Sequence, residues 1–106
     1  MANKLKIVGL LLLLILALVG WYVFFVQNPF IVARARIRYN QAVSQHIDLS
    51  AGPCLGQISS DWVLDIAHLP RQTVDDLPQN QCPDFLMGRV HHFIEMTPQG
   101  EVVVVQ

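Results

Sequence analysis

The hydrophobic segment at residues 7–26, IVGLLLLLILALVGWYVFFV, most constrains how this chain can fold. It contains no charged side chain. At about 1.5 Å of rise per residue, a helix of this length spans roughly 30 Å, which is the thickness of the hydrocarbon core of a bilayer. The segment therefore predicts a single transmembrane helix, preceded by a short cytoplasmic tail at residues 1–6.

A segment of this kind is either a permanent anchor or a signal peptide that is removed. The apolar run is longer than a usual signal-peptide core, and its far end carries aromatic residues that are typical of a membrane interface. These are Trp21, Tyr22, Phe24 and Phe25. Residues 17–19 lack the small side chain that a cleavage site needs at its third position. We therefore expect an uncleaved signal anchor, with a secreted head released by cleavage as the alternative.

Basic and acidic residues are segregated along the chain. All Lys and Arg residues except Arg71 and Arg89 lie within residues 1–46, and all Asp and Glu residues lie within residues 47–106. Phosphate groups would be repelled by so acidic a C-terminal part, which argues against nucleic acid as a partner.

The segment after the hydrophobic run is ambiguous between helix and strand. Apolar residues alternate with Arg over residues 31–39, which suits a strand. However, Asn28 is a good helix N-cap and Pro29 suits the first helical position. We predict a helical stem over residues 29–45. Its three Arg side chains would fan out around the helix to reach lipid headgroups or a partner.

Two cysteines, Cys54 and Cys82, decide the expected orientation. The positive-inside rule is nearly tied, because Lys4 and Lys6 on one side face three Arg residues on the other. A cysteine pair in a small tethered domain suggests a disulfide formed in an oxidising compartment. The alternative is two free buried thiols in a cytoplasmic domain. We expect a single-pass protein with a cytoplasmic N-terminus and an extracytoplasmic C-terminal domain.

The rest of the chain is expected to form a small disulfide-stapled head at residues 54–106, reached through a basic helical stem and linker at residues 27–53. The expected strands are at residues 54–58, 62–68, 88–96 and 102–105. The last two form an antiparallel hairpin, and a long loop at residues 69–84 precedes them. The predicted fold class is therefore a single N-terminal transmembrane α-helix plus a small α+β, mainly β, head with an antiparallel C-terminal hairpin.

Two details of the head are open to test. Four consecutive Val residues at 102–105 suit a strand that pairs centrally and is buried on both faces, although an edge strand open to a partner strand is the alternative. The adjacent acids Asp75 and Asp76 lie in a proline-bounded loop, so we expect both to be solvated.

Histidines and carboxylates provide the only pattern that resembles a metal or catalytic site. The candidates are Asp65, His68 and His92, with His91 and Glu95 nearby in sequence. Zinc needs three or four ligands that converge on one point, and the spacing of these residues does not enforce that. We expect each His to be half-buried and hydrogen-bonded to the backbone or to a carboxylate. We assign no catalytic residue, no cofactor and no metal site.

The expected function is that of a non-enzymatic accessory or binding module. It would be held in the lipid bilayer and would present its acidic head to a membrane or envelope protein. A function from another class is a small metal-dependent or acid–base hydrolase that uses Asp65, His68 and either His91 or His92.

Overall fold

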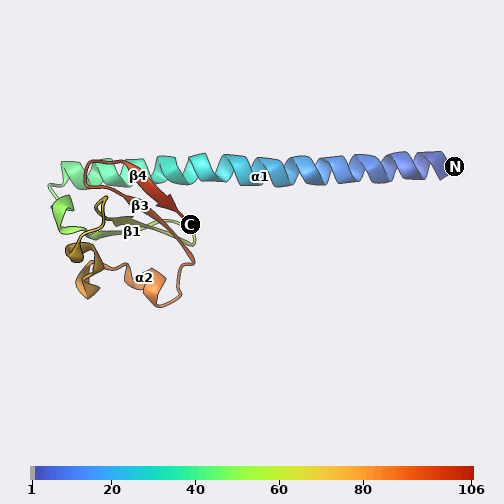
Figure 1. Cartoon of the computed structure of the whole chain (residues 1–106). Coiled ribbons are helices and arrows are strands. Elements are labelled where there is room, and N and C mark those ends of the chain that lie inside the picture. Colours follow the sequence, from blue (N-terminus) through green and yellow to red (C-terminus); the bar gives the residue numbers. More distant parts are fainter. Residues whose placement is uncertain (1) are drawn as a thin grey trace. The chain divides into compact units, whose positions relative to one another are not determined.

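The computed structural model describes residues 2–106, with the side chains of residues 3–23 and 30–106 (Figure 1). The helical elements are α1 (Ala2–Ser44), η1 (Leu49–Ala51), η2 (Thr73–Asp76), η3 (Pro78–Asn80) and α2 (Pro83–Leu86). The strands are β1 (Cys54–Ser59), β2 (Trp62–Ile66), β3 (His92–Met96) and β4 (Val102–Val105). The chain forms two compact units, one that ends at Phe30 and one that comprises Ile31–Gln106. We call the second unit the head.

The first unit is an apolar helix. Its segment Asn3–Val23 is long and apolar enough to cross a membrane. Every side chain in this segment is exposed. A helix that presents apolar side chains on all sides matches the prediction of a membrane span in length and composition, which are also features of a signal sequence.

The last turns of α1 belong to the head. The prediction of a helical stem is confirmed, and the alternative of a strand is wrong. The predicted start of a separate helix at Asn28 and Pro29 is also wrong, because α1 continues through both residues to Ser44. Ile31, Ala35 and Ala42 are buried, and their spacing places them on one side of the helix. The two alanines have no exposed surface, so they allow the helix to lie close against the sheet. This segment is therefore part of the hydrophobic core.

Within residues 2–106, the four strands form one sheet in the order β1-β2-β3-β4. The pairs β1–β2 and β3–β4 are antiparallel, whereas β2–β3 is parallel. The predicted C-terminal hairpin is confirmed, but β3 begins at His92 and not at Gly88. The parallel pairing brings together two hairpins that are distant in sequence, and it determines where the polar side chains of the head meet.

One face of the sheet packs on α1. Leu64 and Ile66 of β2 and Ile94 and Met96 of β3 have no exposed surface and form the centre of this core. Side chains alternate along a strand, so Val63 and Asp65 of β2 point to the opposite face. Their partners on β3, Phe93 and Glu95, point to the same face. The sheet therefore has a second face that is free to build a site.

The expectation that residues 102–105 are buried centrally is wrong. β4 lies at the edge of the sheet and pairs with β3 alone. Val103 is 36% exposed and Val105 is 38% exposed. The reason is the parallel β2–β3 pair, which places β2 on the other side of β3 and leaves the hairpin partner outermost.

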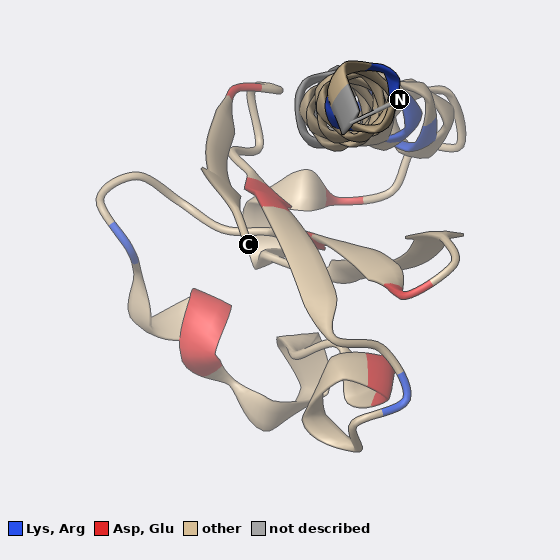
Figure 2. Ribbon diagram, turned by 90° about the vertical axis from the view of Figure 1, so that its right-hand side faces the viewer, with Lys and Arg blue, Asp and Glu red and all other residues tan. Residues whose placement is uncertain are grey.

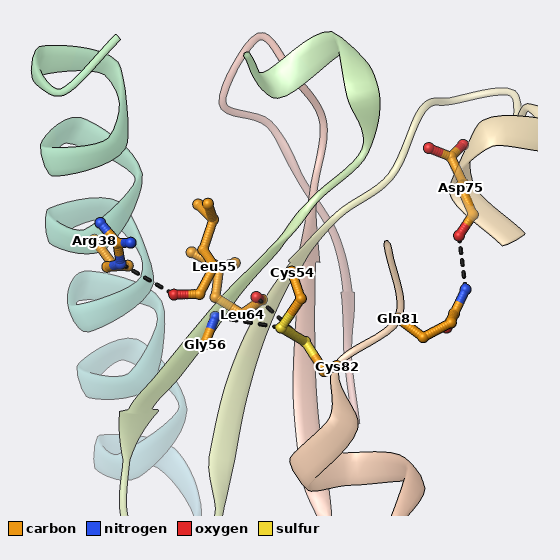
Figure 3. The surroundings of a disulfide bond; sticks show 8 residues. All are labelled: Arg38, Cys54, Leu55, Gly56, Leu64, Asp75, Gln81 and Cys82. Carbon is orange, nitrogen blue, oxygen red and sulfur yellow. Dashed lines mark hydrogen bonds between the residues drawn. A yellow bond between two sulfur atoms is a disulfide. The ribbon is translucent and has the colours of Figure 1, made fainter. Parts of the chain in front are cut away.

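The stem arginines contact the head itself rather than extending away from it. Arg38 Nε donates to the Leu55 carbonyl at 3.1 Å (Figure 3). Arg34 donates to the Ile58 carbonyl at 3.3 Å, which is a second contact with β1. Arg36 donates to a carbonyl of the β3–β4 turn at 3.4 Å. This differs from the expectation that the three side chains reach lipid headgroups or a partner, and it ties α1 to β1 and to the β3–β4 turn. Figure 2 shows acidic residues on the strands and on the segments that connect them.

Candidate binding cleft

The face of the sheet opposite α1 contains a cleft. β2 and β3 run parallel with Val63 opposite Phe93 and Asp65 opposite Glu95, so these four side chains share one face. Residues 81–86 cross over this face and form the other wall. The enclosed volume is about 120 Å³. We call this site, lined by the four strand residues and by residues 81–86, the Asp65 cleft.

The predicted disulfide is confirmed and holds one wall of the cleft. Cys54 and Cys82 are bonded, with their Cα atoms 5.1 Å apart (Figure 3). Cys82 is buried against Val63 and Val90. The neighbouring Gln81 side chain donates to the Asp75 carbonyl at 2.7 Å. The wall therefore has a covalent attachment to β1 and a hydrogen bond to η2.

Asp65 is the polar group at the base of the cleft. Its side chain belongs to a residue that is only 8% exposed, and its Oδ1 atom has no hydrogen-bond donor. Among the described residues, no other buried side-chain nitrogen or oxygen lacks a partner. Burial, followed by the negative charge of Glu95, raises the pKa of Asp65 to about 7.

The second carboxylate of the cleft is already paired. Arg71 Nη1 lies 3.1 Å from Glu95 Oε1, and Arg71 Nε lies 2.8 Å from Asp76 Oδ1. Hydrogen bonds to Asp76 and Glu95 raise the pKa of the guanidinium, which stays protonated. Arg71 thus balances Glu95 and Asp76 but makes no hydrogen bond with Asp65.

The opening of the cleft is apolar. Phe85 and Phe93 make an edge-to-face contact with ring centroids 5.0 Å apart. Leu86 is 65% exposed and the adjacent Met87 is 68% exposed. An exposed apolar cluster beside a buried polar group is a common arrangement at binding sites.

The His68 side chain pairs with Asp75. Its Nδ1 lies 2.8 Å from Asp75 Oδ1, and its backbone N–H donates to Asp75 Oδ2 at 2.9 Å. The Gln72 N–H also donates to Asp75 Oδ2, at 2.8 Å. The expectation that Asp75 is solvated is wrong, because this carboxylate is buried and caps η2. Burial acts to raise the pKa of Asp75, but these three hydrogen bonds together lower it.

His91 and His92 form a separate cluster with Asp61. Asp61 lies in the turn between β1 and β2. Asp61 Oδ1 accepts the His91 N–H at 2.8 Å and lies 2.7 Å from His91 Nδ1. His92 Nε2 is 3.6 Å from Asp61 Oδ2, and its ring stacks on Trp62 at 4.7 Å. The hydrogen bond with His91 lowers the pKa of Asp61. His68 and His91 therefore pair with Asp75 and Asp61, and not with Asp65.

The three metal candidates thus have separate surroundings. Asp65 lies in the cleft, His68 is bound to Asp75, and His92 stacks on Trp62. None of the described His, Cys, Asp and Glu residues form a group of three that could hold a metal ion.

Sequence reasoning missed the role of Glu95 and residues 85–86 in this site. The available signal was Asp65 itself, a charged residue inside the otherwise apolar strand sequence WVLDI. A buried charge in such a strand needs a partner or a raised pKa, and both outcomes mark a site. No protein-family model, curated protein sequence or solved structure matches the chain.

Proposed function

We propose that the chain is a membrane-tethered binding module that presents the Asp65 cleft to an envelope protein outside the cytoplasm. The proposal rests on two features that occur together in the cleft. A buried carboxyl oxygen lacks a donor, and the exposed apolar side chain of Leu86 lines the opening. A partner that donates a hydrogen bond to this oxygen and covers the apolar surface would therefore bind favourably.

The tether in this proposal is the apolar part of the segment Asn3–Val23, from Ile7 on, inserted in the lipid bilayer as an uncleaved signal anchor. The Cys54–Cys82 disulfide supports an oxidising location for the head. The N-terminus is then cytoplasmic and the protein crosses the membrane once. The stem arginines, which bind carbonyl groups of the sheet, support a head that folds directly onto the end of the helix.

The surroundings of the histidines favour binding over hydrolysis. An acid–base hydrolase would need Asp65, His68 and either His91 or His92 around one reacting atom. His68 and His91 each lie within 2.8 Å of another aspartate, Asp75 and Asp61 respectively. The acidic, carboxylate-based cleft instead suits a partner that carries positive charge.

Site-specific photocross-linking in intact membranes tests this function. A photoreactive benzoylphenylalanine replaces Leu86 at the opening of the cleft, and the same group at Gln57, an exposed residue of β1, is the matched control. We expect the probe at Leu86 to give one discrete adduct with a membrane or envelope protein, and the probe at Gln57 to give none of it. Equal adducts from both positions, or none from Leu86, would contradict the proposal.

A further inference from the structure

We propose that the Asp65 cleft binds the guanidinium group of an arginine side chain of the partner, with Asp65 as its counter-ion. This inference rests on the proposed binding function and specifies the chemistry of the ligand. It follows from the buried, donor-free Oδ1 of Asp65, the aromatic rings beside it and the size of the cleft.

The charge in the cleft selects a cation. Asp65 faces Glu95 across the β2–β3 pair, and Asp75 adds a further negative charge from η2. Arg71 is the cationic group that acts on Asp65, and its hydrogen bonds go to Glu95 and Asp76. Anionic ligands would be repelled by this arrangement, whereas a cation that reaches Asp65 Oδ1 supplies the missing donor.

The shape and lining of the cleft favour a guanidinium among cations. The Asp65 carboxyl group, whose Oδ1 lacks a donor, can accept from the planar set of donors of an arginine, while Glu95 stays paired with Arg71. The rings of Phe85 and Phe93 offer surfaces on which a flat cation can stack. A guanidinium is also more weakly hydrated than an ammonium group, so it loses less on entering a partly buried site.

The volume of the cleft itself suits one side-chain end, and a larger hollow of about 560 Å³ shares Val63, Gln81, Cys82 and Leu86 with it. The cleft encloses about 120 Å³, whereas sites for whole small molecules enclose roughly 300–1,000 Å³. Leu86 at the opening then covers the aliphatic stem of the entering arginine. The rest of the partner would lie on the exposed apolar surface outside the cleft.

Protonation of Asp65 couples this binding to pH. With the pKa of Asp65 raised to about 7, the carboxyl holds a proton in much of the population near neutrality. Binding of a guanidinium requires the ionised form, so the Asp65 proton is released to solvent when the ligand enters. The affinity is therefore expected to be about 30-fold higher at pH 8 than at pH 5.5. Glu95, Arg71 and Asp75 are the charged groups that act on this titration.

The test uses the full chain in zwitterionic micelles and n-butylguanidinium, a mimic of the arginine side chain, followed by amide NMR. We expect a Kd on the order of 1 mM at pH 8, with shifts at Asp65, Phe93 and Leu86. Asp65→Asn should weaken binding at least tenfold and abolish its pH dependence. Glu101→Gln, at an exposed carboxylate outside the cleft, is the matched control and should leave binding unchanged. Leu86→Ala alters only the exposed opening and should weaken binding severalfold.

Three results would each overturn the guanidinium site. They are unchanged binding of n-butylguanidinium in Asp65→Asn, equal affinity at pH 5.5 and pH 8, and equal NMR shifts with neutral n-pentanol. Equal affinity for n-butylammonium would overturn the preference for arginine. The cross-link at Leu86 separates the two proposals. If it forms while n-butylguanidinium fails to bind, the ligand chemistry is wrong and the binding function stands.

Discussion

Two buried aspartates of the head show how hydrogen bonding decides the behaviour of a carboxyl group. Asp65 and Asp75 are both less than one-tenth exposed, at 8% and 1% respectively. The side chain of Asp75 accepts from two backbone N–H groups and the His68 ring, whereas Asp65 Oδ1 accepts from none. Burial therefore raises the pKa of Asp65, while the three bonds to Asp75 overcome burial and lower its pKa. Asp75 therefore has a structural role, whereas Asp65 Oδ1 has no partner within the head.

At this scale we predict that Asp65→Asn stabilises the head in alkaline solution. The folded pKa of about 7 lies above the ordinary value of 3.8, so the free energy of unfolding falls as pH rises between these values. At pH 8 the substitution should raise this free energy by roughly 2 kcal/mol, and at pH 4 it should have little effect. The measurement is urea unfolding of the full chain in micelles, followed by Trp62 fluorescence in a Trp21→Phe background. An equal effect at both pH values would show that Asp65 ionises normally.

The opposite result is expected for Asp75→Asn. This change leaves buried donors without a carboxylate and should lower the free energy of unfolding by roughly 2–4 kcal/mol at pH 7. The contribution of Asp75 is lost as pH falls below about 4, because protonation then removes the charged acceptor. The matched control is Asp76→Asn, whose side chain is 63% exposed and pairs with Arg71 on the surface. Similar losses in both variants would contradict the assigned role of Asp75.

At the scale of elements, local patterns predicted the local structure and failed for pairings between distant segments. The period of two over residues 62–66 reflects nearby residues, and the strand was confirmed. The helix of the stem was also confirmed, but its predicted start at Asn28 and Pro29 was wrong, because α1 runs unbroken from Ala2 to Ser44. The disulfide joins distant residues and was predictable because the chain has a single cysteine pair. The parallel β2–β3 pair joins segments that the intervening loop separates, so no local pattern encodes it. The edge position of β4 and the Asp65–Glu95 pair both follow from that pairing. The partners of His68 and His91 were missed for the same reason.

The disulfide is the element-scale contact with the largest expected effect. It closes a loop with a sequence separation of 28 residues, for which chain entropy gives roughly 3.5 kcal/mol. A Cys54→Ala/Cys82→Ala variant should lose about that much stability, and residues 81–86 should lose amide-exchange protection. The reduced native chain is the control and should behave like the variant. Protection of residues 81–86 that survives both changes would show that the bond does not hold this wall of the cleft.

At the scale of the whole molecule, the head depends on the last turns of α1. Ile31, Ala35 and Ala42 are buried in the same core as the sheet residues. We predict that a fragment of residues 54–106 does not fold, because its sheet would expose the face that α1 covers. A fragment of residues 31–106 should fold and show dispersed amide NMR signals. Dispersed signals from both fragments would contradict this dependence.

The central claim is that α1 holds a disulfide-closed head on the outer side of a membrane, where its cleft can meet a partner. Cysteine labelling on intact cells with a membrane-impermeant maleimide tests it most directly. Asn3→Cys in a Cys54→Ala/Cys82→Ala background is the matched control for the cytoplasmic tail, and it should be labelled only after lysis. For the native chain, we expect labelling of Cys54 and Cys82 on intact cells only after an impermeant reductant is added. Labelling that needs lysis but no reductant would contradict both the disulfide and the outward orientation.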